Sequence, residues 1–259
     1  PPTGAGMYGI QSKTYASANN TNPHIYAHVA ALTENPTHPN IVPEYPHKFF
    51  GPGDLEDNYL SSFPDIKEWP SGFNGYTITP AEALSDPIYF TDTAGDDSGH
   101  VLIDGAISAS GNNALLHFVT SQEMFIKVNG DFSFTGSGSN EANLILEGAG
   151  PIHIMVTGNL SLGANSVNEL GDAIGPQNFV FYVLPGGDVT LHGGPTISAT
   201  IIAPYSHMST QGNPSFEGIS YVNSFHGGGN FTYTQNPYPE EFWDGGFFDW
   251  PLQITAFSY

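Results

Sequence analysis

The chain of 259 residues contains no cysteine, no arginine and only four lysines. Without cysteine, neither a disulfide framework nor a thiolate metal or redox site can form. The lysines face 25 acidic residues, which leaves a formal net charge of -21. Nucleic acid is therefore excluded as a partner, because too few positive charges are present to neutralise phosphates. The same deficit argues against pectate-like polyanions and anionic membrane surfaces as ligands, so cations and neutral polymers remain as candidates.

Long hydrophobic runs are also missing. The sequence has no run of about 18 or more apolar residues, the length that a membrane-spanning helix needs. Direct membrane insertion is therefore not expected. No signal-peptide pattern begins at Pro1. We expect a mature product whose export or anchoring segment has been removed, located outside the cell or at its surface.

The distribution of proline divides the chain into regions that differ in composition and periodicity. Residues 1–98 hold 12 of the 21 prolines and show little periodicity, which predicts an irregular wrap with short helices, packed on the rest or between subunits. Thr79-Pro80-Ala81-Glu82 is a capping box that starts a helix ending at Ser85. A second short helix is expected near Asp54. Residues 99–237 form the main domain and 238–259 an aromatic-rich tail or cap.

A short unit repeats between His100 and Thr234: a strand, then Gly, then Asp or Asn, then apolar, Ser or Thr, apolar. Alternation places the apolar residues on one face and Ser or Thr on the other, and Gly beside Asp or Asn allows a sharp turn. Further strands are expected between the corners, at 114–119, 143–146, 179–183, 197–203 and 216–222. The copies of the repeat are 125–134, 153–162, 182–191 and 225–233, preceded by a degenerate copy at 101–108.

Stacked at roughly 28 residues per coil, these corners predict an all-β fold: a right-handed parallel β-solenoid whose inward faces form one core. An antiparallel β-sandwich is the alternative, because it also uses short alternating strands and glycine-rich turns. The recurrence of one corner sequence favours the solenoid, since a sandwich has no reason to repeat one corner.

A family resemblance rests on a run of motifs in the second half of the chain: 178–182 leading into 187–191, Ile201-Ile202-Ala203-Pro204, 216–222, and the glycines before Phe231-Thr232-Tyr233. Through these residues the segment 153–234 resembles an uncharacterised bacterial surface β-helix domain that lies C-terminal to prepilin-like (PilX-type) pilus-assembly segments. It is also similar, more loosely, to the repeat region of choice-of-anchor A surface adhesins. The likeness implies a parallel β-helix at the cell surface, associated with appendages or adhesion, and implies no catalytic residue.

Two acidic loops are candidate calcium sites, because Ca²⁺ takes six to eight oxygen ligands and short Asp/Gly loops supply several. Neither matches an EF-hand, so solvated charge is the competing interpretation. His24 and His28 have the i, i+4 spacing of a helical metal site, but Pro23 argues against a regular helix there. The candidate calcium ligands are Asp92, Asp96 and Asp97 in one loop and Asp54, Glu56 and Asp57 in the other.

The sequence contains only weak matches to the patterns of known catalytic sites. Asp131 and Asp188 occupy a corner position that Asn159 and Asn230 fill in other copies, so turn geometry explains them better than glycoside hydrolysis. No Gly-x-Ser-x-Gly elbow is present. We therefore expect a protein that is not an enzyme.

The aromatic tail has two interpretations: it caps the open end of the solenoid, or it docks into a neighbouring subunit or onto sugar rings. Its last residues, 253–259, alternate like a strand. Either these residues or the proline-rich N-terminal extension, from Pro1 to about Asn40, could add to a neighbour's sheet. We expect an extracellular, self-assembling filament or appendage subunit with an adhesive role, whose partners are copies of itself. A module binding neutral polysaccharide and a polysaccharide-acting β-helix enzyme are the alternatives. The expected interface residues are Trp243, Trp250, Ile254, Phe257 and Tyr259.

Overall fold

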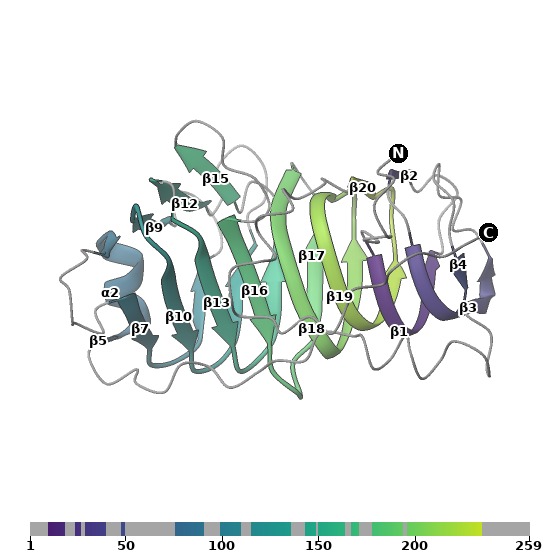
Figure 1. The fold of residues 1–259 in the computed structure, drawn as a ribbon, viewed down its shortest axis with the longest axis horizontal. Helices are drawn as coiled ribbons and strands as arrows, with labels where there is room; N and C mark the ends of the chain where they lie inside the picture. The colour runs from purple at the N-terminus through teal and green to yellow at the C-terminus, as the bar shows by residue number, and fades with distance from the viewer. Residues whose placement is uncertain are drawn as a thin grey trace, which may run out of the picture.

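A computed structural model shows an elongated stack of strands, with a short helix at one end (Figure 1). All strand pairs among the described residues are parallel. The fold is therefore a parallel β-solenoid, as predicted, and the sandwich alternative is wrong. The structure describes residues 10–18, 24–26, 29–39, 48–49, 76–90, 99–109, 115–135, 143–148, 150–163, 167–170, 178–193 and 196–234.

The main face of the solenoid is a ladder of strands in which each coil contributes one. From β5 to β19 the spatial order of these strands follows the sequence. The register runs from Val101 through Ile126 and Ile154 to Phe181. The strands are β5 (Tyr76–Ile78), β7 (His100–Ile103), β10 (Met124–Val128), β13 (Ile152–Val156), β16 (Phe179–Val183), β18 (Thr196–Gln211) and β19 (Ser215–Gly227).

Two further faces close each coil. The second face follows the Gly-Asp or Gly-Asn corner and contains β8 (Ile107–Ala109), β11 (Phe132–Phe134), β14 (Leu160–Leu162) and β17 (Val189–His192), then the second halves of β18 and β19. A separate four-stranded sheet forms another side from β6 (Ile88–Tyr89), β9 (Leu115–Val119), β12 (Asn143–Glu147) and β15 (Val167–Leu170). The strands predicted between the corners are confirmed as β9, β12, β16, β18 and β19.

The core lies inside the coils and follows from the alternation of the sequence. Phe132 and Phe134 of β11 are fully buried, with Ser133 between them pointing outward. Their rings meet aromatic rings of other coils: Phe132 lies 5.7 Å from Phe181, centroid to centroid, in an edge-to-face arrangement. Each coil thus adds one layer to a continuous apolar column.

The coil length is not constant, which corrects the single spacing expected from the repeat. At the corner, Asn159 follows Asp131 after 28 residues and Asp188 follows Asn159 after 29. The next two steps are much shorter, since His207 follows Asp188 after 19 residues and Ser224 follows His207 after 17. In these short coils the main face and the second face are formed by single long strands, β18 and β19, with a register shift between Ala203 and His207.

The N-terminal region is more regular than the expected irregular wrap. Its strands β1 (Ile10–Ala18), β3 (Val29–Pro39) and β4 (Lys48–Phe49) continue the main ladder beyond β19, and β2 (His24–Tyr26) pairs with β20 (Thr232–Thr234). Ile10 and Val29 are register partners in adjacent coils. The sequence separation between these two residues is that of the short coils. The repeat predicted from the sequence has longer coils, so it did not reveal the coils of the N-terminal region.

The other end of the stack carries the predicted helix, α2 (Pro80–Ser85). Its capping box is present: Thr79 Oγ1 accepts from the Glu82 backbone N–H, and the Glu82 carboxylate accepts from the Thr79 backbone N–H at 2.7 Å. These hydrogen bonds lower the pKa of the Glu82 carboxyl. The helix expected near Asp54 and the tail 238–259 lie outside the described residues. Within the described ranges, no helix is long and apolar enough to cross a bilayer.

Candidate binding face

A column of hydroxyl groups runs along the outside of the second face. Ser133 pairs in register with Ser108 on one side and Ser161 on the other, and Thr190 and Ser209 continue the column. Ser108 is exposed and the others are half-buried. Parallel strands lie about 4.7–4.9 Å apart, so the face presents one short hydroxyl side chain at each such step.

A second column beside it consists of the Asp and Asn residues of the corners. Asp131 Oδ1 accepts the backbone N–H of Asn159 at 2.7 Å, Asn159 Oδ1 accepts that of Asp188 at 3.0 Å, and Asp188 Oδ1 accepts that of His207 at 2.9 Å. Each side chain therefore ties its own coil to the next. This explains why Asp and Asn exchange at this position: both provide the acceptor oxygen that the corner needs.

The two columns together form a polar surface, which we call the polar face. Hydroxyl groups both donate and accept hydrogen bonds, so this face suits an uncharged, hydroxyl-rich polymer lying across the coils. Asp131 and Asp188 are two coils apart with Asn159 between them, and one oxygen of each already accepts a backbone N–H. Their placement serves the corner.

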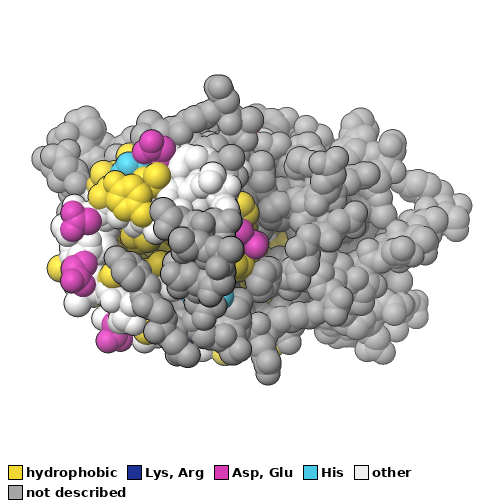
Figure 2. Space-filling view, turned by 60° about the vertical axis from the view of Figure 1, so that its left-hand side comes forward, with side chains coloured by type: hydrophobic (Ala, Val, Ile, Leu, Met, Phe, Trp, Pro, Cys, Tyr) yellow, Lys and Arg dark blue, Asp and Glu magenta, His cyan; other side chains and the backbone are white. Residues whose placement is uncertain are grey.

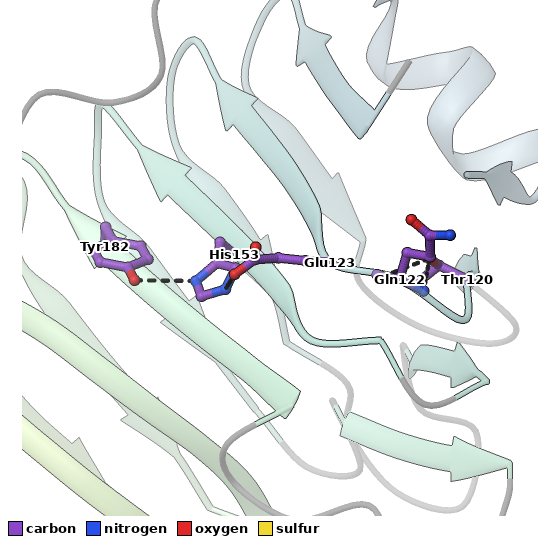
Figure 3. A network of polar contacts seen from close by, with 5 residues as sticks. All are labelled: Thr120, Gln122, Glu123, His153 and Tyr182. Carbon is purple, nitrogen blue, oxygen red and sulfur yellow. Dashed lines mark hydrogen bonds and ion pairs between the residues drawn. The ribbon is translucent and has the colours of Figure 1, made fainter. Parts of the chain in front are cut away.

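A polar network crosses three coils on the outer side of the main face, with two of its three side chains buried (Figure 3). His153 of β13 lies between Tyr182 of β16 and Glu123, which precedes β10: His153 Nδ1 is 3.1 Å from the Tyr182 hydroxyl, and His153 Nε2 is 2.9 Å from Glu123 Oε1. The ring of Phe125 stacks on His153 with centroids 4.9 Å apart. His153 and Tyr182 are only 5% exposed.

The protonation of this network follows from its burial. Desolvation strongly raises the pKa of the Tyr182 phenol, and the nearby Glu123 carboxylate raises it further. The phenol therefore stays protonated and can donate a hydrogen bond to His153 Nδ1. We assign the network a structural role, because it links polar side chains of three neighbouring coils.

The sequence did not single out this network. His153 and Tyr182 are 29 residues apart, and Met155 is the register partner of Tyr182. What the sequence does contain is two polar side chains at outward positions, spaced by the length of one coil. This spacing indicates a contact only once the coil length is known.

The predicted calcium and interface residues cannot be compared with the structure. The six candidate calcium ligands and the five aromatic and aliphatic residues of the tail lie outside the described residues, as does His28. His24 lies on strand β2, so it does not take part in a helical i, i+4 pair. In the part of the chain that the structure describes, no group of three or more His, Asp or Glu side chains could hold a metal ion.

Comparison with known proteins places the chain by family. No curated protein matches it. Among solved structures, a glycosylated ice-binding protein (LeIBP) from Arctic yeast is 16% identical, with a TM-score of 0.40 over 90% of this chain and 91% of that one. The family model described as Domain of unknown function (DUF7305) matches residues 75–238, from the strand β5 to just beyond β20. The chain therefore belongs to the DUF7305 family.

Proposed function

We propose that the protein is a non-catalytic structural protein outside the cell, a filament subunit that assembles with copies of itself and adheres through its surface. The observation that supports this most is the form of the stack. Among the described strands, β4 pairs only with β3 and β5 only with β7, so within the described part of the chain no further strand pairs at either end of the ladder. Strand edges without a neighbour carry unpaired backbone groups that another copy of the chain can satisfy.

The charge of the chain sets a condition for this assembly. Each chain carries -21, and acidic side chains are visible at the described surface near α2 (Figure 2). Glu82, Asp86 and Asp104 of this end are exposed. Copies that meet end to end therefore repel each other until salt screens the charges.

Electron microscopy of the purified full chain tests the proposal. We expect filaments at about 1 M salt, where the Debye length is about 3 Å, and dispersed particles at about 0.01 M, where it is about 30 Å. Calcium is the alternative screening ion that the acidic composition favours, so a series with added Ca²⁺ belongs to the same experiment. Dispersed particles under every condition would contradict a filament role.

A module that binds neutral polysaccharide is the second candidate, and the polar face favours it. The face offers hydroxyl groups in register on five successive coils, Ser108, Ser133, Ser161, Thr190 and Ser209. A polysaccharide chain also repeats its hydroxyl groups along its length, so several weak hydrogen bonds can form together. An adhesive filament and a polysaccharide-binding module are compatible uses of one solenoid.

Co-sedimentation with cellulose and chitin tests this second candidate. Replacing Ser161 and Thr190 by glutamate is expected to weaken binding at least about ten-fold, or about 1.4 kcal/mol, because two desolvated charges would face an uncharged ligand. The matched control is Gln122→Glu, which adds a charge at an exposed turn away from the polar face. An equal loss of binding in both variants would show that the polar face is not the polysaccharide-binding surface. Release of soluble sugars from the polysaccharide would favour the enzyme alternative.

A further inference from the structure

The order of strands in the main ladder departs from the order of the sequence at one junction. From β5 to β19 each strand lies beside the next main-face strand of the chain, but the neighbour after β19 is β1. The Ser12 hydroxyl donates to the backbone oxygen of Asn223 at 3.0 Å across 211 residues of sequence. In Figure 1 the purple strands β1 and β3 accordingly lie beyond the yellow-green β19.

This junction is as well formed as those between consecutive coils. Both halves of β1 pair with β19, from Ile10 with Ser220 to Ala18 with Gly227. Ile10, Ser12 and Ala16 are fully buried. On the adjoining face β2 pairs with β20, so segments from near both ends of the sequence build this part of the stack together. Only non-covalent contacts hold them.

The strands from the N-terminal region do not belong to the family domain. The DUF7305 match begins at residue 75 and ends at residue 238, so it contains β5 to β20 and omits β1 to β4. Without β1, the edge of β19 would expose its backbone groups and the core behind Val222 and Phe225, both fully buried here. The family domain therefore has a docking edge at β19, and in this structure a segment outside the domain occupies it.

Direction and length allow that segment to come from another copy. The strands β1, β3 and β4 continue the stack in the same parallel sense in which β5 to β19 run. Lys48 of β4 and Thr77 of β5 occupy the same register column. The chain between them is about as long as one wide coil, such as the 28 residues from Asp131 to Asn159. One coil step is therefore enough to place β5 next to β4 in a continuous stack.

We propose that β1 to β4 of one chain dock on β19 and β20 of a second copy, which joins the chains head to tail in one continuous parallel solenoid. This inference rests on the proposed filament function. The exchanged contacts are chemically those of the closed chain, so the exchange costs little once the chains are concentrated. The spatial order of strands then follows the sequence in every chain, and β4 no longer has to lie at the opposite end of the stack from β5.

A reversible disulfide lock tests the exchange, because the chain has no cysteine of its own. Ser17 and His226 are register partners across the β1–β19 junction, and neighbouring parallel strands bring Cα atoms within the range that a disulfide spans. We expect the variant with Ser17→Cys and His226→Cys, oxidised as dispersed chains at low salt, to stay out of the filament pellet at high salt. Reduction should restore pelleting.

The matched control is Thr190→Cys with Ser209→Cys, a register pair between β17 and β18 in the same column. It joins two coils consecutive in sequence, so its oxidised form should assemble as the unmodified chain does. If the oxidised Ser17–His226 lock also assembles, the exchange is wrong while the filament function stands. If the unmodified chain never assembles, the proposed function fails and the exchange with it.

Mixing two single-cysteine chains gives an independent readout. A chain with Ser17→Cys and a tagged chain with His226→Cys are assembled together and then oxidised. We expect a disulfide-linked dimer containing one chain of each kind in the filaments, and none in the dispersed mixture at low salt. Filaments that yield no mixed dimer would overturn the exchange.

Discussion

Replacing Phe181 by alanine is expected to lower the free energy of unfolding by about 3–5 kcal/mol, the range for removing a buried aromatic ring. Phe181 is fully buried in β16, at the point where the coils change from long to short. Its ring lies 5.7 Å from Phe132 and 6.4 Å from Phe179, centroid to centroid. Because hydrogen-bonded strands on both sides hold the backbone, the cavity cannot easily collapse. Urea denaturation followed by circular dichroism measures the loss.

The control is Tyr89→Ala in β6, whose side chain is 63% exposed. An exposed substitution of this kind is expected to change the free energy of unfolding by about 0.5 kcal/mol or less. Similar losses in the two variants would mean that the aromatic column does not stabilise the solenoid.

Replacing Gly187 by alanine is expected to cost about 3 kcal/mol, the upper end of the usual range for overpacking. A Cβ atom at this position would lie 2.0 Å from the backbone oxygen of Gly158 in the preceding coil. Backbone of one coil would have to move away from the other, which also strains the corner where Asn159 Oδ1 accepts the Asp188 N–H. Thermal and urea unfolding of the variant measure the cost.

The neighbouring Gly186→Ala is the matched control. Gly186 has a φ of +101°, but a Cβ atom there would meet nothing within 4 Å. Its cost is therefore the backbone strain alone, about 1 kcal/mol. A larger loss at Gly186 than at Gly187 would show that turn conformation, and not close approach of the coils, requires glycine in this corner.

The candidate site was predictable only in part. Alternation predicted that Ser133 and Ser161 point outward, and the exchange of Asp131 with Asn159 between copies indicated turn geometry, which the hydrogen bonds of the corner support. The contact of His153 with Tyr182 was not predictable, since it depends on the length of one coil. The same holds for the register that aligns Thr190 with Ser209 across coils of different length.

The sequence by itself determined what depends on neighbours in the chain. Alternating residues assign the inward face of each strand, Gly with Asp or Asn specifies the corner, and the Thr79–Glu82 capping box starts the helix, because each of these acts within a few residues. Only the tertiary structure decided that β1 lies on β19 and that β2 lies on β20. The hydrogen bonds of a parallel ladder join backbone groups, which every residue carries. Which distant segments pair therefore depends on which strand edge is open and close enough for the chain to reach.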